Sequence, residues 1–351
     1  MGARRLLTIP APRYRLLVGT GGIGSGSFFQ VNGNHTLGRE ESRSGRYLDR
    51  RDYCKLHIIC HYVKRLVGDA ITVIPVGRVG NDEVGRRLLS EMQAAGLRTN
   101  RVGVLEGART LFSFCILYPD GSGGNLTTDN SACSAVTAET IDDAAEDLAG
   151  FRFQGAGIAL AVPEVPLAPR RRLLELGGRY GFLRAASFTS EELPRVEAEG
   201  WLREVDLLAI NGDEARSLLP GSGSWSTEDV VARLTEHTGR KYPGLRWVMT
   251  AGPEGSWTWD GRTTSRGSAL PVPVVGASGA GDAHFAGIIA GLAGGLELHQ
   301  AHDLGRILAA ASLASEHTIN PGITTDQLQD LARLANLHDE ALLRMIGSAS
   351  A

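Results

Sequence analysis

Lysine is almost missing from this chain: in 351 residues it occurs only as Lys55, Lys64 and Lys241. None of the three lies in a Gly-x-x-x-x-Gly-Lys-[Ser/Thr] sequence, which excludes the phosphate loop that such a sequence forms. None lies in the Val-Ala-Ile-Lys strand that is typical of protein kinases. A phosphate site in this chain therefore has to be built from backbone amides and arginine side chains.

The chain also has few cysteines and a small net charge. The sequence has four cysteines, no Cys-x-x-Cys pair, and a formal net charge of −3. So few cysteines exclude a disulfide scaffold, and a nearly neutral chain does not favour nucleic-acid binding, which needs a basic face. No apolar run approaches the ~20 residues that cross a bilayer, and the proline-broken N-terminus is a poor signal peptide. We therefore expect a cytoplasmic protein with neither nucleic-acid nor membrane partners.

The sequence alternates short apolar runs with amphipathic stretches. The apolar runs predict buried strands, and the amphipathic stretches predict helices. This alternation is typical of an α/β fold, in which helices cover both faces of a mainly parallel sheet. The predicted strands are residues 15–19, 71–76, 157–162, 205–210 and 246–250, and the predicted helices are residues 55–67, 82–95, 169–180, 227–237, 281–292 and 302–317.

Two segments interrupt the alternation and predict a small antiparallel lid. Residues 28–37 hold an Asn-Gly pair between apolar runs, which favours a two-residue hairpin turn because both turn positions need positive φ. Residues 110–128 predict two strands joined at the Pro-Asp-Gly of 119–121. We expect these lid segments, about residues 26–52 and 108–130, to close over a cleft and exclude water.

Glycine is abundant, at 45 of 351 residues, and one glycine-rich segment suggests chemistry. Residues 278–287 read SGAGDAHFAG, so small residues lead into a predicted helix whose first turn carries Asp282. The free amides of that turn and the helix dipole attract an anion. Asp282 would then lie beside the anion, where a base could take a proton from an attacking hydroxyl. The segment alone is equally typical of an ordinary acidic residue that follows a glycine turn.

Three further motifs precede this segment: GRVGNDEVG at 77–85, NGDE at 211–214 and TAGPEG at 250–255. In this order, over about residues 15–325, the motifs resemble the ribokinase-like (PfkB-type) carbohydrate kinase family. The resemblance implies a three-layer α/β sandwich with a mainly parallel central sheet and a small antiparallel β lid. It also implies a kinase domain at residues 13–325 and a C-terminal helical segment at 326–351 that packs on the core or frays.

The resemblance implies how phosphate is transferred. Asp282 would be the general base, and the amides of Gly279, Ala280 and Gly281 would form the anion hole. Glu214 would contact Mg²⁺ through water, because Mg²⁺ keeps much of its hydration shell. The residues that would hold the nucleotide, expected to be ATP with Mg²⁺, are Asn211, Glu214, Thr250, Gly252, Gly255, His317 and Asn320.

The acceptor side departs from the family pattern. The family's Gly-Gly before an early helix is Tyr53-Cys54 here, and the aspartate that the first strand usually delivers is absent. The Asp-Thr that opens the last family motif is Gly276-Ala277, which weakens the case for an activating potassium ion. The acceptor site is therefore expected to be rewritten, and its candidate residues are Ser25, Cys54, Lys55, His57 and Glu164.

Three other patterns have competing interpretations. Residues 19–24 (GTGGIG) satisfy the dinucleotide motif, but hairpin-like sequence follows in place of the helix that the motif requires. Cys54, His57 and His61 fall on one predicted helix face and could bind zinc, although a packed or substrate-facing helix is the simpler interpretation. The charged run 39–52 is either a solvated lid edge or dimer surface, or one of its arginines reaches into the cleft to hold an anionic acceptor.

The activity that the resemblance implies is ATP-dependent transfer of the γ-phosphate to a hydroxyl of a sugar or related polyol. A nucleoside acceptor is one alternative, with Phe28, Phe29 and Tyr53 as candidates for stacking on a base. A non-catalytic sugar- or nucleotide-binding protein is another, because a fold does not fix a function. The expected partner is a small molecule, with a homodimer through the lid, and the sequence leaves open whether ATP or ADP is the donor.

Overall fold

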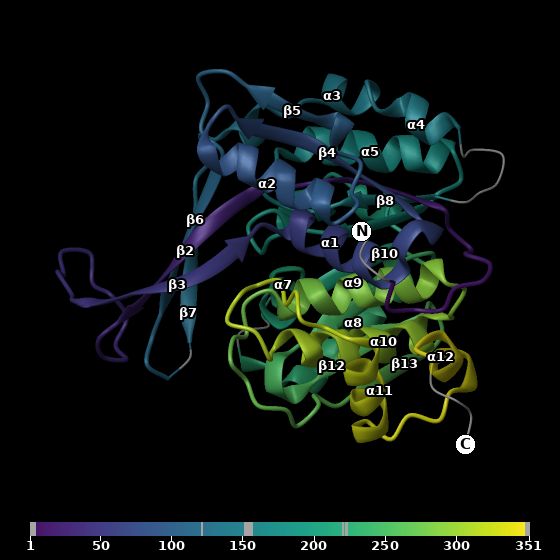
Figure 1. Cartoon of the computed structure of the whole chain (residues 1–351). Helices are drawn as coiled ribbons and strands as arrows, with labels where there is room; N and C mark the ends of the chain where they lie inside the picture. Colours follow the sequence, from purple (N-terminus) through teal and green to yellow (C-terminus); the bar gives the residue numbers. More distant parts are fainter. Residues whose placement is uncertain (1–4, 121, 151–156, 220, 222–223, 348–351) are drawn as a thin grey trace.

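A computed structural model describes residues 5–120, 122–150, 157–219, 221 and 224–347. It shows an α/β body from which a small second sheet projects (Figure 1). Gly121 of the predicted lid turn and residues 348–351 of the predicted C-terminal segment lie outside the described residues. Within the described ranges, no helix has the length and apolar character that a membrane crossing requires.

The larger sheet explains the short apolar runs of the sequence. Strand β1 (Leu16–Thr20) lies inside it, and its residues point alternately to two layers: Leu17 packs in one buried cluster, and Leu16 and Val18 pack in another. A strand that is buried on both faces has to be apolar throughout. The other strands are β4 (Thr72–Gly80), β5 (Val102–Leu105), β8 (Gly157–Ala161), β9 (Leu183–Ser187), β10 (Leu207–Asn211), β11 (Arg246–Thr250), β12 (Ser256–Trp259) and β13 (Thr264–Gly267).

In the described part of the chain these nine strands have the order β13-β12-β11-β10-β9-β8-β1-β4-β5. The strands from β11 to β5 are parallel, and β12 and β13 are antiparallel. The carboxyl ends of the parallel strands therefore meet at one edge of the sheet. In open α/β sheets this edge is where ligands bind.

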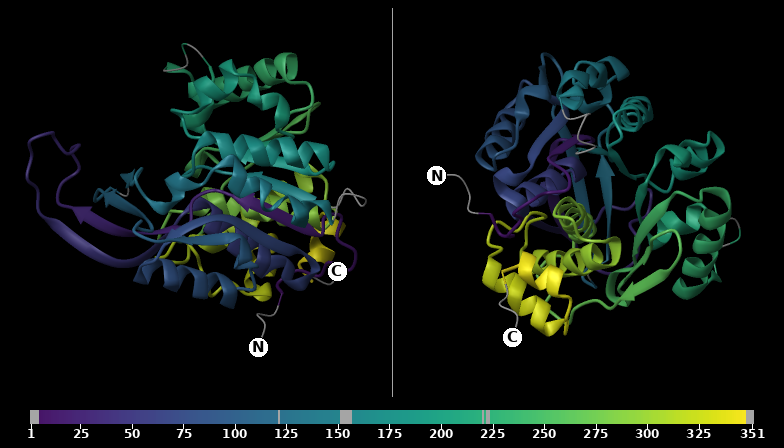
Figure 2. Two further views of the ribbon diagram at one scale, coloured as in Figure 1. Left: turned by 90° about the horizontal axis from the view of Figure 1, so that it is seen from above. Right: turned by 90° about the vertical axis from the view of Figure 1, so that its right-hand side faces the viewer.

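Helices cover both faces of the sheet and make three layers (Figure 1, Figure 2). One face carries α1 (Lys55–Val67), α2 (Glu83–Ala94), α9 (Ala280–Ala293), α10 (Leu298–Ser312), α11 (Thr325–Leu334) and α12 (Glu340–Met345). The other face carries α3 (Ala138–Asp142), α4 (Ala145–Ala149), α5 (Leu167–Arg179), α6 (Leu193–Ala198), α7 (Gly212–Ser217) and α8 (Thr227–Lys241). The predicted α/β sandwich is confirmed.

The second sheet is the lid. Among the described residues its strands are β2 (Gly24–Val31), β3 (Gly45–Tyr53), β6 (Leu111–Leu117) and β7 (Gly123–Thr127), in the order β3-β2-β6-β7. The hairpins β2–β3 and β6–β7 are antiparallel, while the inner strands β2 and β6 pair in parallel. The β2–β3 arm extends far from the body (Figure 2).

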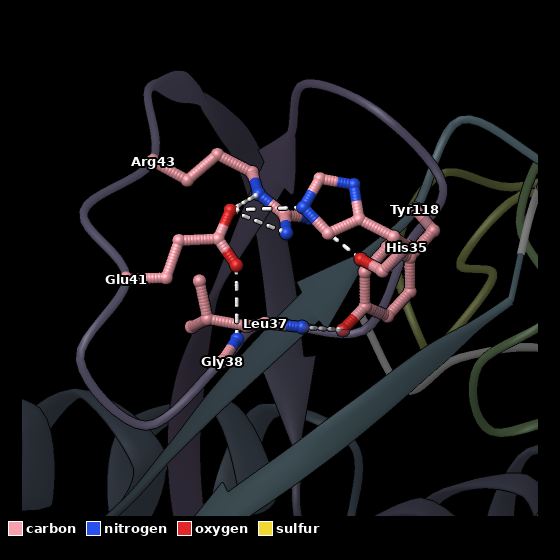
Figure 3. A network of polar contacts seen from close by, with 6 residues as sticks. All are labelled: His35, Leu37, Gly38, Glu41, Arg43 and Tyr118. Atoms are coloured by element: carbon pink, nitrogen blue, oxygen red, sulfur yellow. Dashed lines mark hydrogen bonds and ion pairs between the residues drawn. The ribbon is translucent and has the colours of Figure 1, made fainter.

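The end of this arm has its own polar network (Figure 3). Glu41 accepts hydrogen bonds from the amide of Gly38 (2.9 Å) and from Nε of Arg43 (2.7 Å). The bond from Gly38, then that from Arg43, lowers the pKa of Glu41 to about 2. The amide of Leu37 donates to the hydroxyl of Tyr118 at 3.2 Å, so the network also joins the ends of the two hairpins.

The structure has several elements that were not predicted, and three of its differences from the predictions have a local reason. The Asn-Gly pair does not form a two-residue turn: residues 32–44 connect β2 to β3, because the polar network stabilises a longer loop. Helix α10 ends at Ser312 and not at residue 317, since the carbonyl of Leu313 accepts the amides of Val275 and Gly276 instead. Strand β9 was not predicted, because its sequence, LRAAS, has no β-branched or aromatic residue.

Candidate active site

Helix α9 begins with the glycine-rich turn that the sequence singled out. Gly279 is the N-cap residue and has a φ of 81°, in the left-handed region that glycine tolerates. The amide of Ala280 donates to the carbonyl of Ala277 at 3.2 Å. The amides of Gly279 and Gly281 are therefore better placed than that of Ala280 to bind an anion at this helix start.

Three cavities meet at this turn. The central cavity has a volume of about 300 Å³, the outer cavity about 660 Å³ and the lid cavity about 390 Å³. The central cavity shares Thr250 and Gly281 with the outer cavity, and Lys55 and Asp282 with the lid cavity. Residues that line the central cavity include Lys55, Asn211, Glu214, Thr250, Gly281 and Asp282. Those of the outer cavity include Thr250, Gly252, Gly255, Leu270, Ala280 and Gly281. Those of the lid cavity include Asp52, Lys55, Ser113, Glu164, Gly279 and Asp282.

Asp282 lies where the central and lid cavities join. Its Oδ1 is 3.3 Å from Nζ of Lys55, and the two side chains are 17% and 34% exposed. The carboxylate of Asp282, followed by those of Glu214 and Glu164, raises the pKa of Lys55. The junction therefore holds a carboxylate that can accept a proton beside a lysine that remains charged.

Glu164 lies at the wall of the lid cavity in an unusual backbone conformation. Its φ is 77°, a region that residues other than glycine rarely adopt and that is frequent at functional sites. Its Oε2 accepts the amide of Lys55 at 3.0 Å. A Cβ at Gly22 would lie 2.1 Å from this Oε2, so the glycine leaves room for the carboxyl group. Burial raises the pKa of Glu164 to about 7, although the charge of Lys55 opposes the shift.

Asp52, near the end of β3, is a site residue that the sequence did not single out. Its side chain is buried and lines the lid cavity. Ser113 Oγ donates to Asp52 Oδ2, and Cys115 Sγ lies 3.5 Å from the same oxygen. A Cβ at Gly26 would lie 2.3 Å from Oδ2, so the carboxylate fits only beside a glycine in β2. Burial raises the pKa of Asp52.

Asn211 and Glu214 are brought together at the central cavity by the start of α7. Oδ1 of Asn211 accepts the amide of Glu214 (2.9 Å), and Oε2 of Glu214 accepts the amide of Asn211 (2.8 Å). This reciprocal capping box fixes both side chains, and burial raises the pKa of Glu214. Within the described residues, no group of three or more His, Cys, Asp or Glu side chains could hold a metal ion.

The outer cavity is bounded by the turn after β11. Thr250 ends that strand, and Gly252 and Gly255 follow it with φ values of 54° and 102°. A Cβ at Gly255 would lie 2.3 Å from the carbonyl oxygen of Gly267, so the turn needs glycine there. Because Leu270 and other apolar side chains line the opposite wall, this cavity suits a flat, weakly polar group such as a purine.

Comparison with known proteins decides the family. The sequence model of the pfkB family of carbohydrate kinases matches residues 59–326. The chain belongs to this family. Probable fructokinase-6, chloroplastic, from Arabidopsis thaliana is 26% identical over 232 residues, which are 64% of this chain and 59% of that protein. Probable fructokinase-7 from the same plant is 25% identical over 243 residues, which are 67% of this chain and 68% of that protein. The chain thus spans less than two thirds of the first relative.

Solved structures share the fold at low sequence identity. Ribokinase from Cryptococcus neoformans var. grubii serotype A, in complex with ADP, has a TM-score of 0.74 and 20% identity, over 90% of this chain and 99% of that chain. A nucleoside kinase from Burkholderia thailandensis in complex with inosine has a TM-score of 0.69 and 17% identity, over 90% and 97%. A putative ribokinase II from E. coli in complex with ATP and Mg²⁺ has a TM-score of 0.69 and 17% identity, over 93% and 100%.

Two of the nucleotide contacts predicted for this pfkB-family chain lie away from the outer cavity. Nδ1 of His317 accepts the amide of Arg51 at 3.0 Å. The amide of Asn320 donates to the hydroxyl of Tyr62 at 2.7 Å, and its Nδ2 donates to the carbonyl of Ala311 at 2.8 Å. These hydrogen bonds hold the ring of His317 at β3 and the side chain of Asn320 at α10, and neither residue lines the outer cavity.

Of the acceptor contacts predicted for this family member, some line the lid cavity and others do not. Lys55 and Glu164 line the lid cavity. Ser25 does not, because its Oγ accepts a hydrogen bond from Nη2 of Arg87 at 2.8 Å. Cys54 is 2% exposed and packs in a small apolar cluster, and burial raises its pKa. The structure therefore does not bring Ser25 and Cys54 to the lid cavity.

His57 also lies outside the lid cavity, and the zinc interpretation fails with it. His57 and His61 are neighbours on α1, with ring centroids 6.2 Å apart. Cys54 is the N-cap residue of α1 and faces the apolar cluster, so the three side chains do not converge. The dinucleotide interpretation of residues 19–24 fails as well, because β1 is followed by β2 and not by a helix.

Two arginines of the charged run, Arg43 and Arg46, remain on the lid. Nε of Arg43 donates to Glu41 at the end of the arm, and Nη2 of Arg46 donates to Oε1 of Gln30 at 3.3 Å. Neither side chain lines the lid cavity. Asp52, the last residue of the same run, does line the lid cavity of this pfkB-family chain.

Proposed function

We propose that this protein is an ATP-dependent kinase that phosphorylates a hydroxyl group of a sugar or related polyol. The observation that carries the proposal is the position of Asp282, between the central cavity at the start of α9 and the lid cavity with its buried carboxyl groups. Membership of the pfkB family and the fructokinase relatives support a sugar hydroxyl as the acceptor.

The proposed reaction is a direct displacement at phosphorus. ATP occupies the outer cavity with its γ-phosphate at the first turn of α9, and the acceptor hydroxyl lies in the lid cavity against Asp282. Asp282 takes the hydroxyl proton while that oxygen bonds to phosphorus, and the bond from phosphorus to the leaving ADP oxygen breaks. The amides of Gly279 and Gly281 and the charge of Lys55 stabilise the negative charge on the phosphoryl oxygens.

The central cavity fits Mg²⁺ that is held largely through water. Mg²⁺ prefers oxygen ligands, keeps several waters, and is usually held by one or two carboxylates with the substrate phosphates. Glu214 supplies such a carboxylate, and Asn211 orients it through the capping box. When bound, Mg²⁺ would neutralise phosphate charge in the central cavity.

The lid cavity favours an uncharged, hydroxyl-rich acceptor. Asp52, Glu164 and Asp282 line it, against the positive charge of Lys55. Carboxylates accept hydrogen bonds from hydroxyl groups, whereas they repel a phosphorylated or acidic acceptor. The nucleoside alternative loses two of its three stacking candidates, because Phe28 is buried and Phe29 packs against Phe114 on the lid. The third candidate, Tyr53, lines the lid cavity.

Asp52 provides a test of the acceptor side. We expect Asp52→Asn to raise the acceptor KM about 10- to 100-fold and to change the ATP KM little, since a hydrogen bond to a charged group contributes about 1.5–3 kcal/mol. Steady-state kinetics with each substrate varied in turn measures both values. Asp49→Asn, an exposed position on the same strand, is the matched control. An unchanged acceptor KM in Asp52→Asn would show that Asp52 does not contact the acceptor.

A coupled ADP-release assay tests the proposed function itself. Purified protein with Mg²⁺-ATP is offered sugars, polyols, nucleosides and sugar phosphates, each against a blank without acceptor. We expect ADP release with an uncharged sugar or polyol and little with sugar phosphates, because of the carboxylates in the lid cavity. If thermal-shift measurements show that a sugar binds while no acceptor in the panel causes ADP release, the non-catalytic alternative is correct.

A further inference from the structure

A fourth cavity, of about 620 Å³, lies beside α1 and α2, outside the path from the outer cavity to the lid cavity. We call it the α1–α2 cavity. It shares Tyr53 with the lid cavity, and none of the motifs of the transfer site contributes to it. The α1–α2 cavity is defined by Arg51, His57, His61, Arg65, Glu91 and His317.

The charges of this cavity favour an anion. Arg51 and Arg65 contribute two guanidinium groups, and Glu91 contributes one carboxylate, whose Oε1 lies 3.3 Å from Nη1 of Arg51. Burial lowers the pKa of His57 to about 3 and that of His61 to about 4, so both rings are neutral at pH 7. Positive charge therefore exceeds negative charge at the wall, as in sites that bind phosphate groups through arginine.

The same wall has hydrogen-bonding capacity that the protein does not use. Nδ1 of His57 is buried and has no hydrogen-bond partner among the described residues, whereas the carboxylate of Glu91 interacts with Arg51 and with the hydroxyl of Tyr53 on the same wall. Buried polar atoms without partners are rare in native proteins, and they often mark a position that a bound molecule completes. The terminal torsion of glutamate is soft, so Glu91 can turn either oxygen toward the cavity. A carboxylate accepts several hydrogen bonds, so a hydroxyl group of a ligand can donate to Glu91 beside its contacts within the protein.

The α1–α2 cavity is connected to the transfer site by backbone hydrogen bonds. The amide of Arg51 donates to His317, and the carbonyl of Arg51 accepts the amide of Thr318 (3.1 Å). The amide of Tyr53 in turn donates to Oγ1 of Thr318 at 2.9 Å. Asp52 lies between these two anchored residues. The carbonyl of Thr318 also packs on Gly279, where an added Cβ would be 2.8 Å away.

We propose that the α1–α2 cavity binds a phosphate monoester of a polyhydroxylated compound, such as a sugar phosphate, as an effector. The phosphate group pairs with Arg65 and Arg51, hydroxyl groups of the ligand bond to Glu91, and the ring of the ligand packs on Ile319 and Pro321 at the apolar part of the wall. When a nucleoside triphosphate fills the outer and central cavities, its γ-phosphate occupies the first turn of α9, and the lid cavity then does not compete for this ligand. Occupancy stiffens residues 51–53 and 317–318 and thereby acts on Asp52 and Gly279.

Isothermal titration calorimetry tests the proposal on the full chain. The protein is first saturated with Mg²⁺ and a non-hydrolysable ATP analogue, so that phosphate cannot enter the first turn of α9. The titrants are fructose 1-phosphate, fructose and inorganic phosphate. We expect fructose 1-phosphate to bind at least about 10-fold more tightly than inorganic phosphate, whereas fructose, as a candidate acceptor, reports binding in the lid cavity. We also expect slower hydrogen exchange at the amides of Arg51, Tyr53 and Thr318 when it is bound.

Two variants locate the binding site. Arg65→Gln removes one guanidinium group, and Ala94→Glu places a negative charge at the exposed rim, so each should weaken fructose 1-phosphate binding at least about 10-fold. Arg98→Gln, an exposed arginine outside the cavity, should bind like the unmodified protein. The proposal is wrong if fructose 1-phosphate does not bind, or if both cavity variants bind it unchanged. These outcomes do not depend on turnover, so they are distinct from a failure of the proposed kinase activity.

Discussion

Replacing Asp282 by asparagine is expected to lower turnover at least about 100-fold while nucleotide binding stays close to unchanged. An amide cannot accept the hydroxyl proton, and general-base catalysis contributes typically 10²–10⁴-fold. The loss should fall on kcat, because Asp282 lies at the junction of the central and lid cavities, away from the wall of the outer cavity. Steady-state kinetics gives kcat, and fluorescence titration with a nucleotide analogue gives nucleotide affinity.

Asp326→Asn is the control for this variant. Asp326 also lies in the first turn of a helix, α11, and it is exposed and remote from the cavities. The Asp326→Asn protein should retain normal turnover. Because Asp282→Asn also removes the ion pair with Lys55, thermal unfolding of both variants has to be compared. Turnover of a folded Asp282→Asn protein within tenfold of normal would contradict the role of general base.

Replacing Gly279 by alanine is expected to reduce turnover by about 10²–10³-fold through the backbone alone. The φ of 81° costs an L-residue about 1–2 kcal/mol, and the new Cβ would lie 2.8 Å from the carbonyl oxygen of Thr318. The turn has to move, and its amides move with it. Losing one well-placed oxyanion donor typically reduces turnover by about 10²–10³-fold.

Gly295→Ala separates this local effect from general destabilisation. Gly295 lies just after the other end of α9, with a φ of 96° and no atom within 4 Å of an added Cβ. Both substitutions should lower the free energy of unfolding by about 1 kcal/mol or more. Only Gly279→Ala should lose activity. Equal kcat values in the two proteins would mean that the first turn of α9 does not bind the transferred phosphoryl group.

The sequence alone predicted those parts of the site that a few consecutive residues form. The start of α9 is a glycine turn followed by a helix, and the capping box of Asn211 and Glu214 spans four consecutive residues. Such features follow from propensity and capping within a few residues. The apolar strands were recognisable for the same reason, since a strand with both faces buried needs an apolar run and little else.

Asp52 could not be found in that way. Its place in the lid cavity depends on the pairing of Gly26 with Asp52 across β2 and β3, and on the pairing of β2 with β6 that brings Ser113 to it. Ser113 is 61 positions away in the sequence. In the sequence Asp52 is the last member of a mixed charged run that otherwise lies on the lid surface. The available signal was its position directly before α1, where the family pattern places sugar contacts.

For His317 and Asn320, the sequence order and the position in the structure differ. Their order in the sequence matches a loop that closes over a nucleotide in the family. In the structure this loop is held by hydrogen bonds to residues that are distant in the sequence. Arg51 is 266 positions from His317, and Tyr62 is 258 positions from Asn320. Contacts over such separations depend on tertiary packing, such as that of α1 against α9, which composition and periodicity do not reveal.

The first turn of α9 is the common wall of the outer, central and lid cavities, and this layout has a kinetic consequence. In the proposed reaction, donor and acceptor would meet at the same few backbone atoms, so both would have to be present at once for the phosphoryl group to pass between them. An enzyme with this geometry works through a ternary complex, and a phosphorylated protein intermediate is unnecessary. Its double-reciprocal plots for the two substrates should intersect and not run parallel.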